Sequence, residues 1–242
     1  MKRTSLFVLL LFAHTGGLSA SISAPAEFTC PIDLTKFSGI KNLSGYSDGM
    51  RLDLKQIGAI TQPWALPDCP KCHFVIFDED ASKKKIRKLR PFILSDSYKE
   101  VASRPSYYRL AIIQAHQKRP SFDIGWSYLR ASWQSEKLKE EYADCMKKAL
   151  GAFSKASEGL AKAPKKRKDQ EEHDDYLVSC YLQIELLRKL ARFDEASKAI
   201  SNFPAIGKTE IEWLSDVLKY QKKLIEAKDA EEHNIADAVP EE

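Results

Sequence analysis

The sequence of 242 residues has few long apolar stretches. The unbroken apolar run at residues 6–12 has seven residues, whereas a membrane-spanning helix needs about 20. Lys2 and Arg3 precede this run and small residues follow it at 16–20, which is the order typical of a cleavable export signal. We therefore expect a signal peptide over residues 1–20, a periplasmic or secreted protein, and no stable membrane insertion after cleavage.

The sequence also has no strong excess of charge of either sign. Its net charge is +4, and Lys2 and Arg3 contribute two of these charges, so the mature chain would carry +2. This balance argues against general binding of nucleic acid. A basic run at 162–168 and an acidic end at 229–242 are typical of a solvated linker and a solvated tail.

Common catalytic motifs are missing as well. There is no H-E-x-x-H motif, no Gly-rich phosphate loop and no G-x-S-x-G nucleophile motif, and the five histidines are scattered. We therefore expect a non-catalytic binding or scaffolding protein whose partner is another protein.

Glycines and prolines are concentrated at turn-like intervals in residues 26–80. Residues 50–54 between them alternate apolar and polar side chains, which predicts a half-buried strand. Residues 74–77 form a β-rich apolar run. These patterns predict a small β module over residues 26–80, and this module carries three of the cysteines.

The period becomes helical over residues 82–228, with helices predicted to begin near Pro105 and at Pro120-Ser121. Each stripe is apolar on one face only, so the helices must stack on one another. Residues 190–203 resemble the turn and second helix of a tetratricopeptide repeat, although an irregular helical bundle is an alternative. The predicted class is α+β, a small cysteine-bearing β module followed by an α-helical array of hairpins.

Three of the five cysteines lie in the β module, next to or near prolines, whereas Cys145 and Cys180 fall on apolar helix faces as expected for buried free thiols. A Cys-Pro-x-Cys turn aims two thiolates at one point, which favours a structural zinc site. The candidate metal ligands are Cys30, Asp33, Cys69, Cys72 and His73.

Three alternatives to zinc stay open. Export favours a disulfide among Cys30, Cys69 and Cys72, for instance between Cys30 and Cys69. Residues 69–73 match the C-x-x-C-H motif of haem c, in which Cys69 and Cys72 would form thioethers and His73 would be the axial ligand of an electron-transfer protein. The same spacing occurs in thiol–disulfide oxidoreductases, but their chemistry favours a helix after the first cysteine, and a β-rich run follows here.

Two segments resemble a known family. Residues 28–37, with the sequence FTCPIDLTKF, resemble the opening cysteine knuckle of the bacterial domain-of-unknown-function family 2225, and residues 69–74 resemble its second knuckle. The resemblance implies a cysteine-bearing β module followed by repeat-like helices over most of residues 28–203. His73 stands where the family usually has glycine, and Asp33 departs from a four-cysteine site. The family implies no established activity.

Overall fold

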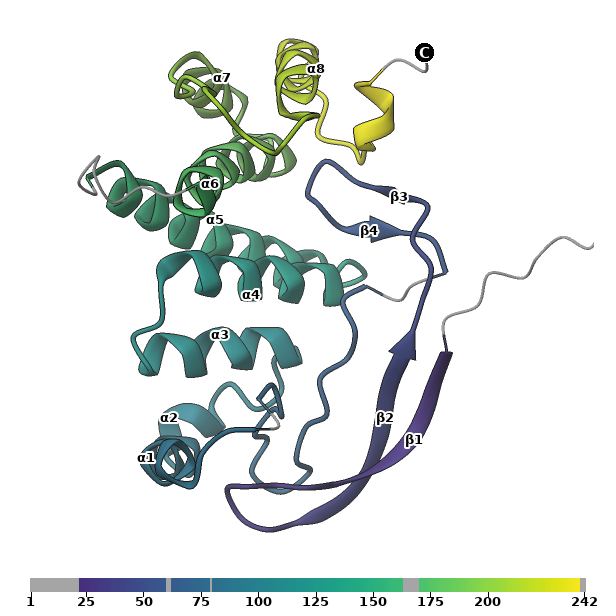
Figure 1. The fold of residues 1–242 in the computed structure, drawn as a ribbon, viewed down its shortest axis with the longest axis vertical. Helices are drawn as coiled ribbons and strands as arrows, with labels where there is room; N and C mark the ends of the chain where they lie inside the picture. The colour runs from purple at the N-terminus through teal and green to yellow at the C-terminus, as the bar shows by residue number, and fades with distance from the viewer. Residues whose placement is uncertain (1–21, 60–61, 79, 163–169, 240–242) are drawn as a thin grey trace, which may run out of the picture.

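The computed structural model describes residues 22–59, 62–78, 80–162 and 170–239 (Figure 1). The signal peptide predicted for residues 1–20 lies outside this part of the chain, as does the basic run 162–168 except for Lys162. The chain begins with a long curved hairpin and then passes through several loops into a stack of helices (Figure 1).

The hairpin consists of β1 (Ile22–Thr29) and β2 (Lys36–Ser44), which pair antiparallel. Exposed and half-buried side chains alternate along β1, as expected for strands with one covered face. The rings of Phe28 and Phe37 stack across the pair with centroids 5.7 Å apart, next to the turn that joins the strands. A second, short hairpin joins β3 (Gly49–Met50) to β4 (Gln56–Ile57).

The helical part begins at residue 83. Its helices are α1 (Lys83–Ile93), α2 (Asp96–Lys99), α3 (Ser106–His116), α4 (Ser121–Gln134), α5 (Lys139–Lys162), α6 (Gln170–Lys189), α7 (Phe193–Ser201) and α8 (Leu214–Glu226). From α3 to α8 each helix packs on the next one in the chain, and Pro105 and Pro120 are the N-caps of α3 and α4. The predicted α+β class, the helical array and both helix starts are therefore confirmed. No described helix is long and apolar enough to cross a membrane.

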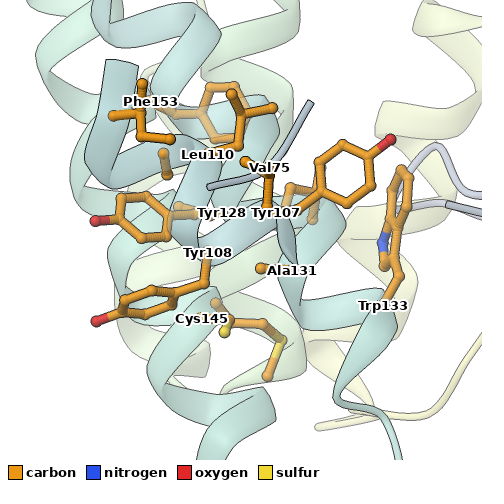
Figure 2. Close-up of a cluster of buried hydrophobic side chains, with 14 of the residues drawn as sticks. Val75, Tyr107, Tyr108, Leu110, Tyr128, Ala131, Trp133, Cys145 and Phe153 are labelled. Carbon is orange, nitrogen blue, oxygen red and sulfur yellow. The ribbon is translucent and has the colours of Figure 1, made fainter. Parts of the chain in front are cut away.

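Helices α3, α4 and α5 share a core of aromatic side chains. Figure 2 shows side chains from these helices around Val75: Tyr107, Tyr108, Leu110, Tyr128, Ala131, Trp133, Cys145 and Phe153. A Cβ atom on Gly125 would lie 2.9 Å from the ring of Phe153, so the glycine lets α4 approach α5 closely. Val75 is fully buried, and it carries the end of the N-terminal module into the helical core.

The prediction of a strand over residues 50–54 is wrong beyond Met50. The chain instead turns at residues 51–55, and Leu54 has a φ of 66°. Leu52 at the tip is fully buried; its carbonyl accepts a 2.5 Å hydrogen bond from the Tyr181 hydroxyl on α6. The loop inserts into the helical array, and the polar Arg51 and Asp53 are buried along with Leu52. The run at 74–77 also forms no full strand and pairs only through the isolated bridge between Asp68 and Val75.

The acidic end is not a fully solvated tail. Residues 229–239 return to the loop at 51–55, where the Leu52 amide donates to the His233 carbonyl at 2.9 Å. Glu232 lies 2.8 Å from the buried guanidinium of Arg51, which also pairs with Asp53 and Glu136. The acidic residue Glu232 therefore serves as a counter-ion for a buried cation.

Candidate metal centre

Two tight turns bring the cysteines of the N-terminal module together. We call residues 30–35, between β1 and β2, the first knuckle, and residues 69–74 the second knuckle. The Leu34 amide donates to the Cys30 carbonyl at 2.9 Å, and the His73 amide donates to the Cys69 carbonyl at 2.9 Å. Each turn is closed by a second bond of 2.9 Å, from Cys30 to Thr35 and from Cys69 to Phe74. The two knuckles therefore have the same backbone geometry.

The fifth residue of each knuckle has a left-handed backbone. The φ angle is 62° at Leu34 and 59° at His73. Glycine adopts this conformation most readily, and here a leucine and a histidine hold it.

In the two equivalent knuckles, Cys30 corresponds to Cys69 and Asp33 corresponds to Cys72. One ligand atom from each of these four residues can be chosen so that all lie within 4.8 Å of one another. Cys30 and Cys69 are fully buried, and Cys72 is 9% exposed. Four of the five predicted ligands thus come together. His73 is not part of this group.

The site is arranged as two close contacts. The Sγ atoms of Cys30 and Cys72 lie 3.5 Å apart, and the Cys69 Sγ lies 3.6 Å and 3.7 Å from the two carboxylate oxygens of Asp33. All five cysteines are free. Even the 3.5 Å between the Sγ atoms of Cys30 and Cys72 is far longer than an S–S bond, which is about 2.05 Å. The disulfide suggested between Cys30 and Cys69 is therefore not present.

The hydrogen bonds of the site favour negative charge. The hydrogen bond from Cys72 lowers the pKa of the Cys30 thiol to about 7, and the same contact raises the pKa of Cys72. Burial acts to raise the pKa of Asp33, but the Thr35 amide at 3.1 Å and the neighbouring thiols lower it to about 2. A site with an ionised carboxylate and a readily ionised thiol suits a cation.

The second knuckle is fastened to the helices through the carbonyl of His73. This oxygen accepts hydrogen bonds from the Tyr98 hydroxyl at 2.9 Å and from Arg109 Nη1 at 2.7 Å. Arg109 also donates to Asp68 at 2.8 Å, just before the knuckle. Partners of this kind hold metal-binding loops in position.

The sequence reasoning missed Tyr98 and Arg109 as supporting residues. Arg109 is 5% exposed and lies among the apolar residues of α3. A charged residue inside an apolar helical stripe signals a buried polar partner, but it does not reveal which residue that partner is.

The surroundings of Cys69 and Cys72 favour neither haem attachment nor thiol exchange. The second knuckle leads into the isolated bridge at Val75 rather than into a helix. Cys145 and Cys180 lie apart from the group, on α5 and α6, and burial raises the pKa of each thiol to about 11. Both are free, as expected, and Cys145 is buried whereas Cys180 is half-buried.

Comparisons with known proteins place this arrangement in a family. The family model described as an uncharacterised protein conserved in bacteria (DUF2225) matches residues 27–229, which include both knuckles and the helices from α1 to α8. No curated protein and no solved structure matches the chain.

Proposed function

We propose that this chain, which belongs to the DUF2225 family, is an exported, non-catalytic binding protein whose N-terminal module is fastened to its helical array by a structural zinc ion. The observation that carries this proposal is the convergence of Cys30, Asp33, Cys69 and Cys72, with ligand atoms within 4.8 Å of one another.

The spacing of the four groups suits tetrahedral zinc. Zinc–sulfur bonds are about 2.3 Å long, so ligand atoms at the corners of a tetrahedron lie about 3.8 Å apart. The measured contacts of 3.5 Å, 3.6 Å and 3.7 Å are close to this value. Thiolates select soft or borderline metals, and three of them with one carboxylate favour zinc over calcium or magnesium.

The ligand set supports a structural role. Four protein groups complete a tetrahedral shell, whereas catalytic zinc sites keep a position for water or substrate. The first knuckle belongs to the hairpin, and the second is held by Arg109 and Tyr98. A metal shared by the knuckles would therefore join the hairpin to the helices.

The binding role and the export rest on other observations. Stacked helix pairs such as α3 to α8 present extended surfaces suited to segments of another protein.

Export is supported by the order of basic, apolar and small residues within positions 1–20. Sequencing the N-terminus of the mature protein tests it: a start near residue 21 in the periplasm or medium supports export, and an intact Met1 in the cytoplasm contradicts it.

Elemental analysis of the purified mature protein tests the metal site. We expect about one zinc per chain, lost in C30S, C69S and C72S and retained in the matched variants C145S and C180S, whose thiols lie outside the site. Zinc-free protein, or zinc that survives all three substitutions, would overturn the proposal. A Soret band that persists after denaturation would show that the site holds covalent haem instead of zinc.

Substitution of Asp33 tests the fourth ligand. Asp33→Cys restores the symmetry of the two knuckles and should tighten zinc binding, whereas Asp33→Ala should weaken it. Both are measured by competition with a chromophoric chelator. Equal affinities in Asp33→Ala and the parent would remove Asp33 from the ligand set.

A further inference from the structure

A second site lies beside the knuckles, where α1 passes the C-terminal end of α3 (Figure 1). A cavity of about 620 Å³ opens here, and its lining includes Phe74, Phe77, Leu89, the basic Lys85, Lys88 and Arg119, and the acidic Asp78. We propose that this cavity binds an organic anion with an apolar body and a single carboxylate or phosphate head. The proposal goes beyond the zinc role, and its test changes no residue of the cysteine site.

The cavity has the size and lining of a ligand site. Pockets for small molecules typically measure about 300–1,000 Å³ and combine apolar walls with a few polar groups. Phe74 and Phe77 line one wall with ring centroids 6.0 Å apart, and Ile86 and Leu89 line the wall on α1. These walls suit an aliphatic or aromatic body rather than a bare inorganic ion.

The cations at the cavity differ in how they are paired. Lys85 lies 3.7 Å from Asp78, and Arg119 pairs with Asp123 at 2.7 Å. Within the described part of the chain, Lys88 forms no ion pair, and it lines the cavity from α1, one turn after Lys85. Lys88 is therefore the cation available to an incoming anionic head.

The whole of α1 adds to the positive potential. Its sequence KKKIRKLRPFI contains six basic residues and no acidic one. Lys83, Lys84, Arg87 and Arg90 are exposed and do not line the cavity. Basic residues clustered at the mouth of an apolar cleft attract anions and disfavour cations.

Calorimetric titration of the full mature protein tests the proposal with four probes: dodecanoate, dodecyl phosphate, neutral dodecyl maltoside and inorganic phosphate. The three dodecyl compounds are kept below their critical micelle concentrations. We expect saturable one-to-one binding of at least one of the two dodecyl anions. Dodecyl maltoside and inorganic phosphate should bind at least about tenfold more weakly than that anion. Comparison of the two anions identifies whether the head is a carboxylate or a phosphate. Tight binding of the maltoside, or no saturable binding of either anion, overturns the proposal.

A matched pair of variants on α1 locates the binding. Lys88→Glu should weaken anion binding by at least about tenfold, because it replaces the cation at the cavity with a like charge. Lys84→Glu makes the same change in net charge on the same helix, outside the lining, and should stay within about twofold of the parent. Circular dichroism and zinc content establish that both variants are folded. Equal losses in the two variants would assign the binding to the general charge of α1 and overturn the cavity site.

Discussion

Arg109 on α3 donates a 2.7 Å hydrogen bond from Nη1 to the carbonyl oxygen of His73, the residue that directly follows Cys72 of the candidate metal site. The same guanidinium reaches Asp68 through Nη2 and the Arg104 carbonyl through Nε. One buried side chain therefore holds both ends of the second knuckle against the helical array.

Removal of this side chain should weaken both the fold and the metal site. We expect Arg109→Ala to lower the free energy of unfolding by about 1–3 kcal/mol, because it removes three hydrogen bonds of a buried guanidinium. Zinc affinity should fall about 10- to 100-fold, as is typical when a residue that orients a metal-binding loop is lost. Urea unfolding and chelator competition measure the two effects.

Arg90→Ala is the control for this prediction, since Arg90 is exposed on α1. We expect it to change the stability by no more than about 0.5 kcal/mol. The loss of stability in Arg109→Lys should lie between those of Arg109→Ala and Arg90→Ala, because an ammonium cannot reproduce the fork of donors of a guanidinium. Unchanged zinc affinity in Arg109→Ala would mean that the knuckle holds its shape without the helix.

The thiol of Cys30 should titrate early in the metal-free protein. Its pKa is lowered to about 7 by the hydrogen bond from Cys72, whereas an unperturbed thiol titrates near about 8.5. A thiol pKa that is lower in the folded chain stabilises that chain once the thiol is ionised. This contribution is fully present above about pH 8.5 and is lost as the pH falls through about 7.

Ultraviolet absorbance of the thiolate measures this titration. We expect one thiolate to appear with a midpoint near 7, and Cys72→Ala to move the midpoint upward by removing the thiol donor. Cys145→Ser should leave it in place, because burial raises the pKa of Cys145 to about 11. If the first thiolate appeared only well above pH 8, the contact between Cys30 and Cys72 would not exist in solution.

The hydroxyl of Tyr181 should contribute measurably to stability. Tyr181 is fully buried, and its hydroxyl donates to the Leu52 carbonyl at the tip of the inserted loop. Tyr181→Phe keeps the ring and leaves this carbonyl without its donor, so we expect a loss of about 1–3 kcal/mol in urea unfolding. Tyr46→Phe removes the same atom from a side chain that is 55% exposed, and it should change the stability little.

The helical array could be predicted because its signals are local. Apolar spacing within each helix and the prolines at 105 and 120 depend on near neighbours in sequence. The loop at 51–55 could not, because its alternation of apolar and polar residues is the pattern of a strand, whereas Arg51, Leu52 and Asp53 are all buried. The backbone of Leu52 is hydrogen-bonded to Tyr181 and His233, which no local pattern connects to it.

The candidate site shows the same division between local and distant signals. The Cys-Pro-x-Cys spacing predicts the second knuckle, the family resemblance implies the first, and the candidate ligands include the four residues that converge. His73 was included because histidine is a common ligand, but the first and fourth residues of each knuckle supply the grouped atoms. Asp33 was identifiable because it occupies the fourth position, whereas Arg109 was not, since its contact joins residues 36 positions apart.

The return of the C-terminal segment to Leu52 has a consequence for the order of folding. Arg51 obtains one of its carboxylates from Glu232, which is synthesised 181 residues later. Chains emerge from the ribosome with the N-terminus first, and early segments usually fold first. Here the loop at 51–55 cannot reach its final position until residues 229–239 have followed. The loop at 51–55 is therefore completed only after a segment more than 170 residues further along the chain has been synthesised.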